Sequence, residues 1–302
     1  MHLSRILLAT AGLSLIASPI VLANQKPTPR PEFKTRVVAT GLQSPRGIVV
    51  GRDDEVYFTE VPTPGVAGGL NGVKVLDVRK GKISTVNTGE PEPVDITMGE
   101  DGTLYWTCRT AGVILQRNPD CSVSPLLTGL DRPTGITADL FGNIFFTEVP
   151  EPGMGGGTNT VNVDHGDAER ILNVGDPEPT DIAVAFGGTV YWTCTSAGVI
   201  VSRDRLGNVE VLLSGLDKPM GIALNRNRDR LYWTEVPTPG VSGADGGTNE
   251  VWEYNLRNGR TTLVNAGDPY PADVTVARDG TVYWTCTSAG VIVEARRTRG
   301  HP

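Results

Sequence analysis

Three aspartates recur at the same point of a repeated motif, and they are the first candidates for chemistry. They stand in GEPEPVDI (89–96), GDPEPTDI (175–182) and GDPYPADV (267–274) as Asp95, Asp181 and Asp273. Three glutamates recur in FTEVPTPG, FTEVPEPG and WTEVPTPG as Glu60, Glu148 and Glu235. Carboxylate oxygens are the ligands that Ca²⁺ prefers, and clustered carboxylates raise one another's pKa enough to make a general base.

The same carboxylates also have a structural interpretation. A carboxylate at the start or end of a strand can accept hydrogen bonds and tie neighbouring elements together. The sequence leaves both alternatives open. The six residues are either a ring of oxygen ligands for Ca²⁺ or another divalent cation, or ties within a repeated scaffold.

Two further sets of repeated positions are candidate ligand contacts. One position in the PEP, PEP and PYP sequences is occupied by Glu92, Glu178 and Tyr270. The long loops close on Asn71, Asn159 and Asn249. Variation at a repeated position is what recognition of an asymmetric ligand requires, whereas an asparagine in a loop also forms Asx turns.

The motifs belong to an internal repeat that predicts the fold. Successive copies of the FTEVPTPG-type motif and of YWTC start 86 to 92 residues apart. Each unit divides into two segments that open on a Pro turn, with GLQSPRGI, GLDRPTGI and GLDKPMGI alternating with the three aspartate motifs. A segment of roughly 43 residues is near the length of a four-stranded propeller blade.

Each segment contains four short β-strands separated by turns, and the 37 Gly and 22 Pro residues fit this pattern. We therefore predict an all-β, six-bladed β-propeller built from three tandem double-blade repeats. The last segment has strands at 273–276, 282–286 and 291–295 and then ends. We expect residues 35–39 to supply its outer strand and join the two termini, since an open ring would leave strand edges unpaired.

These motifs resemble those of known propeller families. Tyr-Trp-Thr and Phe/Trp-Thr-Glu resemble the YWTD propellers, and P-x-G-I before a short strand looks like the NHL group. The combination of PxGI, a Gly-containing turn, F/W-T-E and a later Asn is similar to streptogramin (virginiamycin B) lyase-like and SMP-30/lactonase-like propellers. The resemblance covers about residues 35–297 and implies a small-molecule site at the channel mouth, with lactonase, lyase or cyclase chemistry as one alternative.

Histidine is where the sequence departs from the lyases. The resemblance implies a histidine general base beside a divalent metal, but the three histidines, His2, His165 and His301, fall at no matching position. Lyase activity is therefore not carried over. The lactonase-like resemblance implies Glu, Asp and Asn around Ca²⁺, for which no histidine is needed.

The cysteines are expected to be structural. Cys108, Cys194 and Cys286 share one motif position. In a propeller, threefold symmetry would separate them beyond the roughly 7 Å limit for a disulfide and too far for one zinc ion. Cys121 opens an outer strand at the opposite end of its blade from Cys108. We expect buried free thiols in the repeated motif, and core packing for the Tyr-Trp pairs beside them.

Composition and the chain start predict the setting. The beginning MHLSR, an apolar run and a small-residue cleavage site predict a signal peptide over residues 1–23. A Pro-rich linker follows at 24–33, the propeller spans 34–297, and residues 298–302 form a basic tail. The net charge of −7 argues against nucleic acid and anionic membranes.

We expect a secreted monomer that binds a small molecule, a divalent cation or both at a carboxylate-lined channel mouth. The alternatives left open are a lactonase-, lyase- or cyclase-like enzyme, and a non-catalytic module for a protein or glycan. Loops on a rigid scaffold are where binding usually resides, which favours the face that carries the Pro turns.

Overall fold

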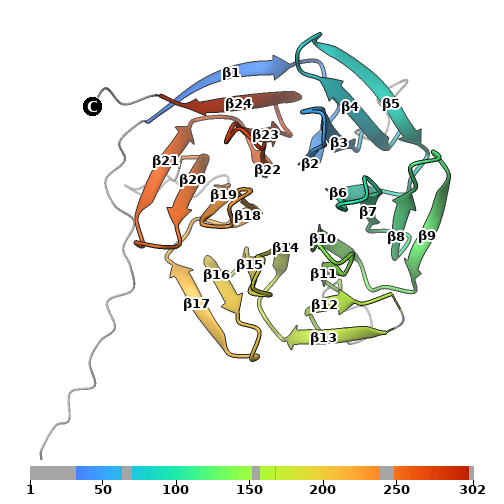
Figure 1. The fold of residues 1–302 in the computed structure, drawn as a ribbon, viewed down its shortest axis with the longest axis vertical. Coiled ribbons are helices and arrows are strands. Elements are labelled where there is room, and N and C mark those ends of the chain that lie inside the picture. Colours follow the sequence, from blue (N-terminus) through green and yellow to red (C-terminus); the bar gives the residue numbers. More distant parts are fainter. Residues whose placement is uncertain (1–31, 63–69, 152–156, 167, 238–247, 299–302) are drawn as a thin grey trace, which may run out of the picture.

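A computed structural model of the chain describes residues 32–62, 70–151, 157–166, 168–237 and 248–298. These residues form twenty-four β-strands in six antiparallel four-stranded sheets, arranged as blades around a central axis (Figure 1). The protein is thus a six-bladed, all-β propeller, as the repeat predicts. No helix long and apolar enough to cross a membrane occurs among the described residues.

Every blade has the same plan, with its innermost strand at the axis. Blade one holds β2 (Pro45–Val50), β3 (Val56–Glu60), β4 (Gly72–Asp77) and β5 (Lys82–Thr88). Blade two holds β6 (Pro93–Met98), β7 (Leu104–Cys108), β8 (Val113–Arg117) and β9 (Val123–Thr128). Blade three holds β10 (Pro133–Ala138), β11 (Ile144–Glu148), β12 (Thr160–Asp164) and β13 (Glu169–Val174).

The second half of the ring repeats this order, except at its end. Blade four holds β14 (Pro179–Val184), β15 (Val190–Cys194), β16 (Val199–Arg203) and β17 (Val209–Ser214). Blade five holds β18 (Pro219–Leu224), β19 (Arg230–Glu235), β20 (Glu250–Asn255) and β21 (Thr261–Ala266). Blade six holds β22 (Pro271–Val276), β23 (Val282–Cys286), β24 (Val291–Arg297) and, as its outer strand, β1 (Phe33–Ala39).

The outer strand of blade six comes from the other end of the chain. β1 pairs antiparallel with β24, with Phe33 opposite Arg297 and Val37 opposite Val293. The two strands lie side by side in Figure 1. Glu32, just before β1, forms an ion pair with Arg297 (2.5 Å). The two ends of the described chain are therefore held together in one sheet.

The core lies between neighbouring blades. The innermost and middle strands of one blade pack their apolar side chains on those of the next, in six clusters around the ring. Trp106, Trp192 and Trp284, from the YWTC motif, are fully buried in these clusters. This agrees with the core role predicted for the motif, because a blade buried on both faces needs apolar residues on both sides of its strands.

One threonine hydroxyl in each blade ties that blade to the next. In blade two, the Thr107 hydroxyl accepts the Asp95 N–H (3.1 Å) and donates to the carbonyl of Thr134 in blade three (2.7 Å). The equivalent residues that make the same two bonds are Thr59, Thr147, Thr193 and Thr234. In blade six, Thr285 makes the bond to the next blade, donating to the carbonyl of Arg46 (2.5 Å). Thr107 is fully buried, where an unsatisfied amide would be costly. This role gives a physical reason for the Thr in both repeated motifs.

The pairing of β1 gives a stability prediction. A chain lacking residues 24–40 exposes the edge of β24, and we expect its melting temperature to fall by on the order of 10 °C with a broader transition. A chain lacking only residues 24–31 is the control and should melt like the full mature chain. Circular dichroism measures the three melting temperatures. Equal values for all three chains would contradict a stabilising role for the β1 to β24 pairing.

Candidate functional site

Three aspartates, one from every second blade, line the central channel. Asp95 Oδ1 accepts the N–H of Ile96 in its own strand, and Oδ2 accepts the N–H of Ile136 in the next blade, both at 2.7 Å. The same pair of bonds, at 2.6 to 2.7 Å, is made by Asp181 to Ile182 and Ile222, and by Asp273 to Val274 and Ile48. Three carboxylates therefore satisfy six backbone amides, one from each innermost strand.

Glycines alternate with the aspartates around the axis because the strands approach closely there. A Cβ on Gly47, Gly135 or Gly221 would lie 2.5 Å from the Cα of the aspartate in the following blade. No side chain fits at that distance. We call the three aspartates and the three glycines the waist. The alternation of Asp and Gly in the sequence is thus a packing requirement.

The waist carboxylates have raised pKa values. Burial raises the pKa of Asp95 to about 6, while hydrogen bonds from Ile136 N–H and from the neighbouring aspartates oppose the rise. The pKa values of Asp181 and Asp273 lie well above their usual range because burial is reinforced by the charge of Asp95. Like charges facing one another across an axis disfavour ionisation. The three groups therefore titrate as one coupled set.

The waist does not have the arrangement of a metal cage. Among the described residues, no group of three or more His, Cys, Asp or Glu side chains could hold a metal ion. Both oxygens of each waist aspartate already accept backbone N–H groups. Of the two alternatives left open by the sequence, these bonds favour a structural tie between blades over a ring of cation ligands.

The three repeated glutamates lie away from the waist. Glu60 pairs with Lys74 (2.5 Å) and accepts the N–H of Gln43 (3.0 Å). Glu148 and Glu235 likewise accept the N–H groups of Asp131 (2.6 Å) and Asp217 (2.9 Å). Each glutamate therefore holds the Pro turn of its own blade. None of the three lines the channel pocket, so the structure does not bring the two carboxylate sets together as one ring.

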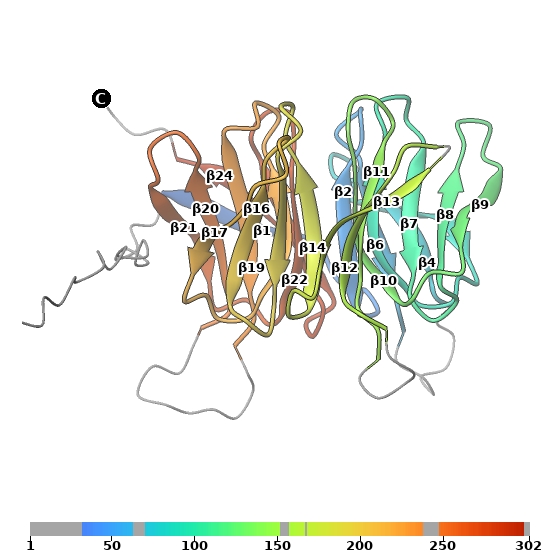
Figure 2. The same cartoon turned by 90° about the horizontal axis from the view of Figure 1, so that it is seen from below.

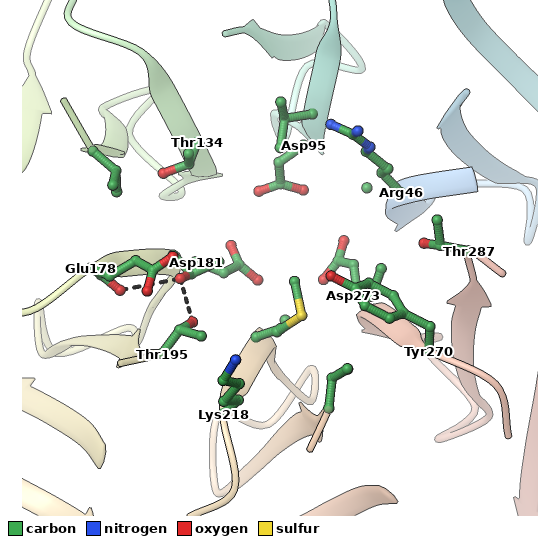
Figure 3. A pocket seen from close by; sticks show the side chains of 18 of the residues that line it. Arg46, Asp95, Thr134, Glu178, Asp181, Thr195, Lys218, Tyr270, Asp273 and Thr287 are labelled. Carbon is green, nitrogen blue, oxygen red and sulfur yellow. Dashed lines mark hydrogen bonds between the residues drawn. The ribbon is translucent and has the colours of Figure 1, made fainter. Parts of the chain in front are cut away.

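A cavity of about 590 Å³ opens above the waist on the face of the Pro turns. We call it the Pro-turn pocket. It is lined by the waist aspartates and by the residue after each of the six prolines, and in blades four to six also by the residue before the proline. Figure 3 shows their side chains converging on the axis. The polar side chains around it include Arg46, Arg109, Glu178, Lys218 and Tyr270.

The residue before each proline has a left-handed backbone, with φ between 48° and 56° in all six blades. This conformation is uncommon outside glycine, so the six turns share one strained geometry and project their side chains from equivalent places. The residues are Ser44, Glu92, Arg132, Glu178, Lys218 and Tyr270. Identical backbone therefore carries different chemistry in each blade, which is the variation predicted for Glu92, Glu178 and Tyr270.

The charges at these positions are compensated in one half of the ring. Glu92 pairs with Arg46 (3.1 Å), and Arg132 pairs with Glu151. In blades four and five the situation differs. Within the described part of the chain, neither the Glu178 carboxylate nor the Lys218 ammonium takes part in a hydrogen bond or ion pair, and both line the Pro-turn pocket.

Arg109 breaks the repeat at the pocket wall. Its equivalents Thr195 and Thr287 donate to the carbonyls of Pro219 and Pro45 in the next blade, both at 2.7 Å. No equivalent bond is made by the Arg109 side chain among the described residues, and its guanidinium lines the pocket, 3.9 Å from a carboxylate oxygen of Glu92. The Nε of Arg109 is buried without a hydrogen-bond partner among the described atoms. Burial lowers the pKa of Arg109, and the nearby Arg46 and Arg132 add to the effect.

The asparagines line neither this pocket nor the waist. The main-chain carbonyl of each asparagine accepts the N–H of the glycine that opens the next segment, at 2.8 to 2.9 Å. The donors to Asn71, Asn159 and Asn249 are Gly89, Gly175 and Gly267 in that order. The Nδ2 of Asn159 also donates to the carbonyl of Asp176 (2.7 Å). These contacts hold the loops in which the asparagines lie.

The cysteines and the described histidine stand apart from the pocket. Cys108, Cys194 and Cys286 are free and buried, as predicted, and burial raises the pKa of each thiol to about 12. Cys121 is free and exposed. His165 lies on an outer turn, with Nδ1 2.8 Å from Asn143 Oδ1. The predicted signal peptide, His2 and His301 fall outside the described residues.

Sequence reasoning missed Arg46, Arg109 and Lys218. Each departs from the residue at the equivalent position of the other repeats, Arg109 against Thr195 and Thr287, for example. A search for departures from the repeat, in place of shared residues, finds all three. Glu92 was predicted to contact ligand together with Glu178 and Tyr270, but only the last two line the pocket.

Solved structures of six-bladed propellers are similar to this chain. A streptogramin B lyase structure matches with a TM-score of 0.59 and 17% identity, covering 88% of this chain and 98% of that one. Virginiamycin B lyase from Staphylococcus aureus matches with a TM-score of 0.57 and 19% identity, covering 87% and 99%. A nidogen/laminin complex matches with a TM-score of 0.59 and 18% identity, covering 75% and 81%.

These likenesses define the class of protein, a six-bladed β-propeller whose solved neighbours include both an enzyme and a component of a protein complex. At such identities they show the fold alone. No protein-family model matches the sequence, and no curated protein is significantly similar to it.

The raised pKa values of the waist predict how stability changes with pH. Above about pH 4 the folded chain holds protons on the waist aspartates that the unfolded chain has released. The stability that the waist contributes is therefore full below pH 4 and is lost as the pH rises through about 6. We expect the free energy of unfolding to fall by on the order of 1–3 kcal/mol between pH 4.5 and 7.5.

Urea unfolding at four pH values tests this. Asp95→Asn removes one titrating group, so its stability should depend less on pH over the same range. Asp120→Asn, in an exposed turn where hydrogen bonds from Ser122 lower the pKa, is the control and should keep the wild-type slope. A wild-type stability that rises toward pH 7.5, with the same slope in Asp95→Asn, would contradict the coupled waist.

Proposed function

We propose that this protein is a secreted ligand-binding propeller that takes a small zwitterionic molecule in the Pro-turn pocket. The observation that carries the proposal is a pair of opposite charges on adjacent blades, Glu178 and Lys218, which line one cavity and whose charged groups form no hydrogen bond or ion pair among the described residues. The equivalent charges Glu92 and Arg132 are neutralised by ion pairs in the other half of the ring. A ligand with an ammonium and a carboxylate would complete the pattern.

The rest of the pocket fits such a ligand. Tyr270 occupies the second equivalent position beyond Glu178 and is 36% exposed, so its ring adds an apolar surface to the pocket wall (Figure 3). Arg109 adds a guanidinium whose Nε has no partner among the described atoms. Charge-assisted hydrogen bonds of this kind are stronger than neutral ones.

The shape of the site favours a small molecule over a protein or a glycan chain. The cavity of about 590 Å³ is within the range of small-molecule pockets, roughly 300–1,000 Å³. It is concave and ends at the waist, so an extended partner could occupy only its mouth. The proposal is one of binding.

Three related compounds test the two charges separately. L-Phenylalanine carries both charges, phenethylamine only the ammonium and 3-phenylpropionate only the carboxylate. We expect L-phenylalanine to bind most tightly by isothermal titration calorimetry. Glu178→Gln should weaken the binding of phenylalanine and phenethylamine about tenfold. Lys218→Gln should weaken the binding of phenylalanine and phenylpropionate about tenfold. In each case the complex loses one charged hydrogen bond.

Glu210→Gln is the matched control for these variants. Glu210 lies on β17, the outer strand of the same blade as Glu178. Its substitution therefore removes one carboxylate without changing the pocket. Its affinities should equal those of the wild type. Equal affinities for the three compounds, or a loss in the control as large as in Glu178→Gln, would overturn the proposal.

A divalent cation at the channel stays a prediction on which this proposal does not depend. A cation at the waist would stabilise the ionised carboxylates, so Ca²⁺ should then raise the melting temperature at pH 7.5, and Asp181→Asn should remove the rise. Thermal melts with Ca²⁺, Mg²⁺ and Mn²⁺ measure this. Melting temperatures that no cation changes would contradict the prediction.

A further inference from the structure

A second cavity of about 590 Å³ lies on the other side of the waist. It is bounded by the turns that join each innermost strand to the second strand, and we call it the hairpin pocket. We propose that the hairpin pocket binds an amphipathic organic anion, with an acidic group at its rim and an apolar body inside. This site lies on the opposite face from the Pro-turn pocket and does not depend on the function proposed there.

The rim of the hairpin pocket is built from one equivalent residue of each blade. These residues come second after the end of the innermost strand, in turns closed by the same backbone hydrogen bond, and all of them line the cavity. In blade order they are Arg52, Glu100, Leu140, Phe186, Arg226 and Arg278. The backbone is repeated and the side chains are not, as at the other mouth.

The cationic residues fall on three consecutive blades. Arg226, Arg278 and Arg52 come from blades five, six and one, so they form one arc of the rim. Their side chains make no hydrogen bond or ion pair within the described residues, and all three are exposed. Arginines in this state are available for a carboxylate, sulfonate or phosphate, which they bind through parallel N–H donors.

The opposite arc of the rim is apolar. Leu140 and Phe186, from blades three and four, are 41% and 55% exposed. The guanidinium of Arg228 lies over the Phe186 ring, 4.8 Å from its centre, and extends the cationic arc toward the apolar one. An exposed apolar pair beside four arginines fits a ligand that is itself apolar at one side and anionic at the other.

The inner wall of the cavity includes an apolar belt between the rim and the waist. Each innermost strand ends on an aliphatic or methionine side chain that lines the cavity, and these residues are Val50, Met98, Ala138, Val184, Leu224 and Val276. An inorganic anion would gain nothing from this belt. A hydrocarbon or aromatic body would bury apolar surface there, at about 25 cal/mol per Å².

Acids near the rim offset part of the arc. Asp101 and Asp279 accept N–H bonds within their own turns, from Thr103 and Thr281, at 2.9 Å, and the Thr103 bond together with the charge of Arg52 lowers the pKa of Asp101. Glu100 is the one carboxylate among the six rim residues, and it lies across the ring from Arg226. The positive side of the rim is therefore centred on Arg226 and Arg278.

The test uses 8-anilinonaphthalene-1-sulfonate, an aromatic sulfonate whose fluorescence rises on transfer to an apolar site, with the folded mature chain. N-Phenyl-1-naphthylamine, the same aromatic body without the sulfonate, is the neutral probe. We expect the sulfonate to bind more tightly than the neutral probe. The double variant Arg226→Gln/Arg278→Gln should weaken the binding of the sulfonate about tenfold or more and leave the affinity for the neutral probe unchanged.

Two controls separate this site from other causes. Arg205→Gln, in the outer turn of blade four, removes an arginine outside the cavity and should bind the sulfonate like the wild type. Leu140→Gln alters the apolar arc and should weaken both probes. Equal sulfonate affinity in the double variant and the wild type would overturn the proposal, and so would an equal loss of both probes in the double variant. Glu178→Gln should leave the sulfonate unaffected, since it lies at the other mouth.

Discussion

The fold depends on hydrogen bonds between carboxylates and backbone amides at the channel axis. Six innermost strands converge there, and their amides point where no neighbouring strand can accept them. Each aspartate has two oxygens, so it satisfies one amide of its own blade and one of the next. Three aspartates are therefore enough for six blades, and the glycines between them leave the space that the close approach requires.

This constraint explains the period of the sequence. A single-blade repeat would place an aspartate in every blade, and six carboxylates would crowd one axis. The double-blade repeat halves the charge and provides the glycine that packs against each Cα. The threonines of the YWT and FTE motifs add a second tie between blades, this time with a hydroxyl as both donor and acceptor. The local motifs and the double period thus have one common cause.

The fold could be predicted because the repeat is visible in the sequence. Pro turns, alternating apolar residues and the spacing of YWTC identify blades and strands without knowledge of any contact. The site was harder to predict because its decisive property is the absence of a partner. Glu92 and Glu178 occupy the same motif position, yet among the described residues only Glu92 forms an ion pair, and its nearest partner, Arg46, lies 46 residues away in the chain.

The aspartates show the same limit from the other side. Their spacing indicated a ring, and the ring exists, but spacing alone could not show that both oxygens of each carboxylate are used by the backbone. Arg109 illustrates how an exception carries information. It stands where two other repeats have a threonine that bonds to the next blade, and its longer side chain lines the cavity instead.

The waist has a consequence for traffic through the ring. The same three carboxylates line both cavities, so any passage between the two faces runs past them. The two faces are also coupled electrostatically, because an ion bound in either cavity changes the free energy of ionising the carboxylates between them.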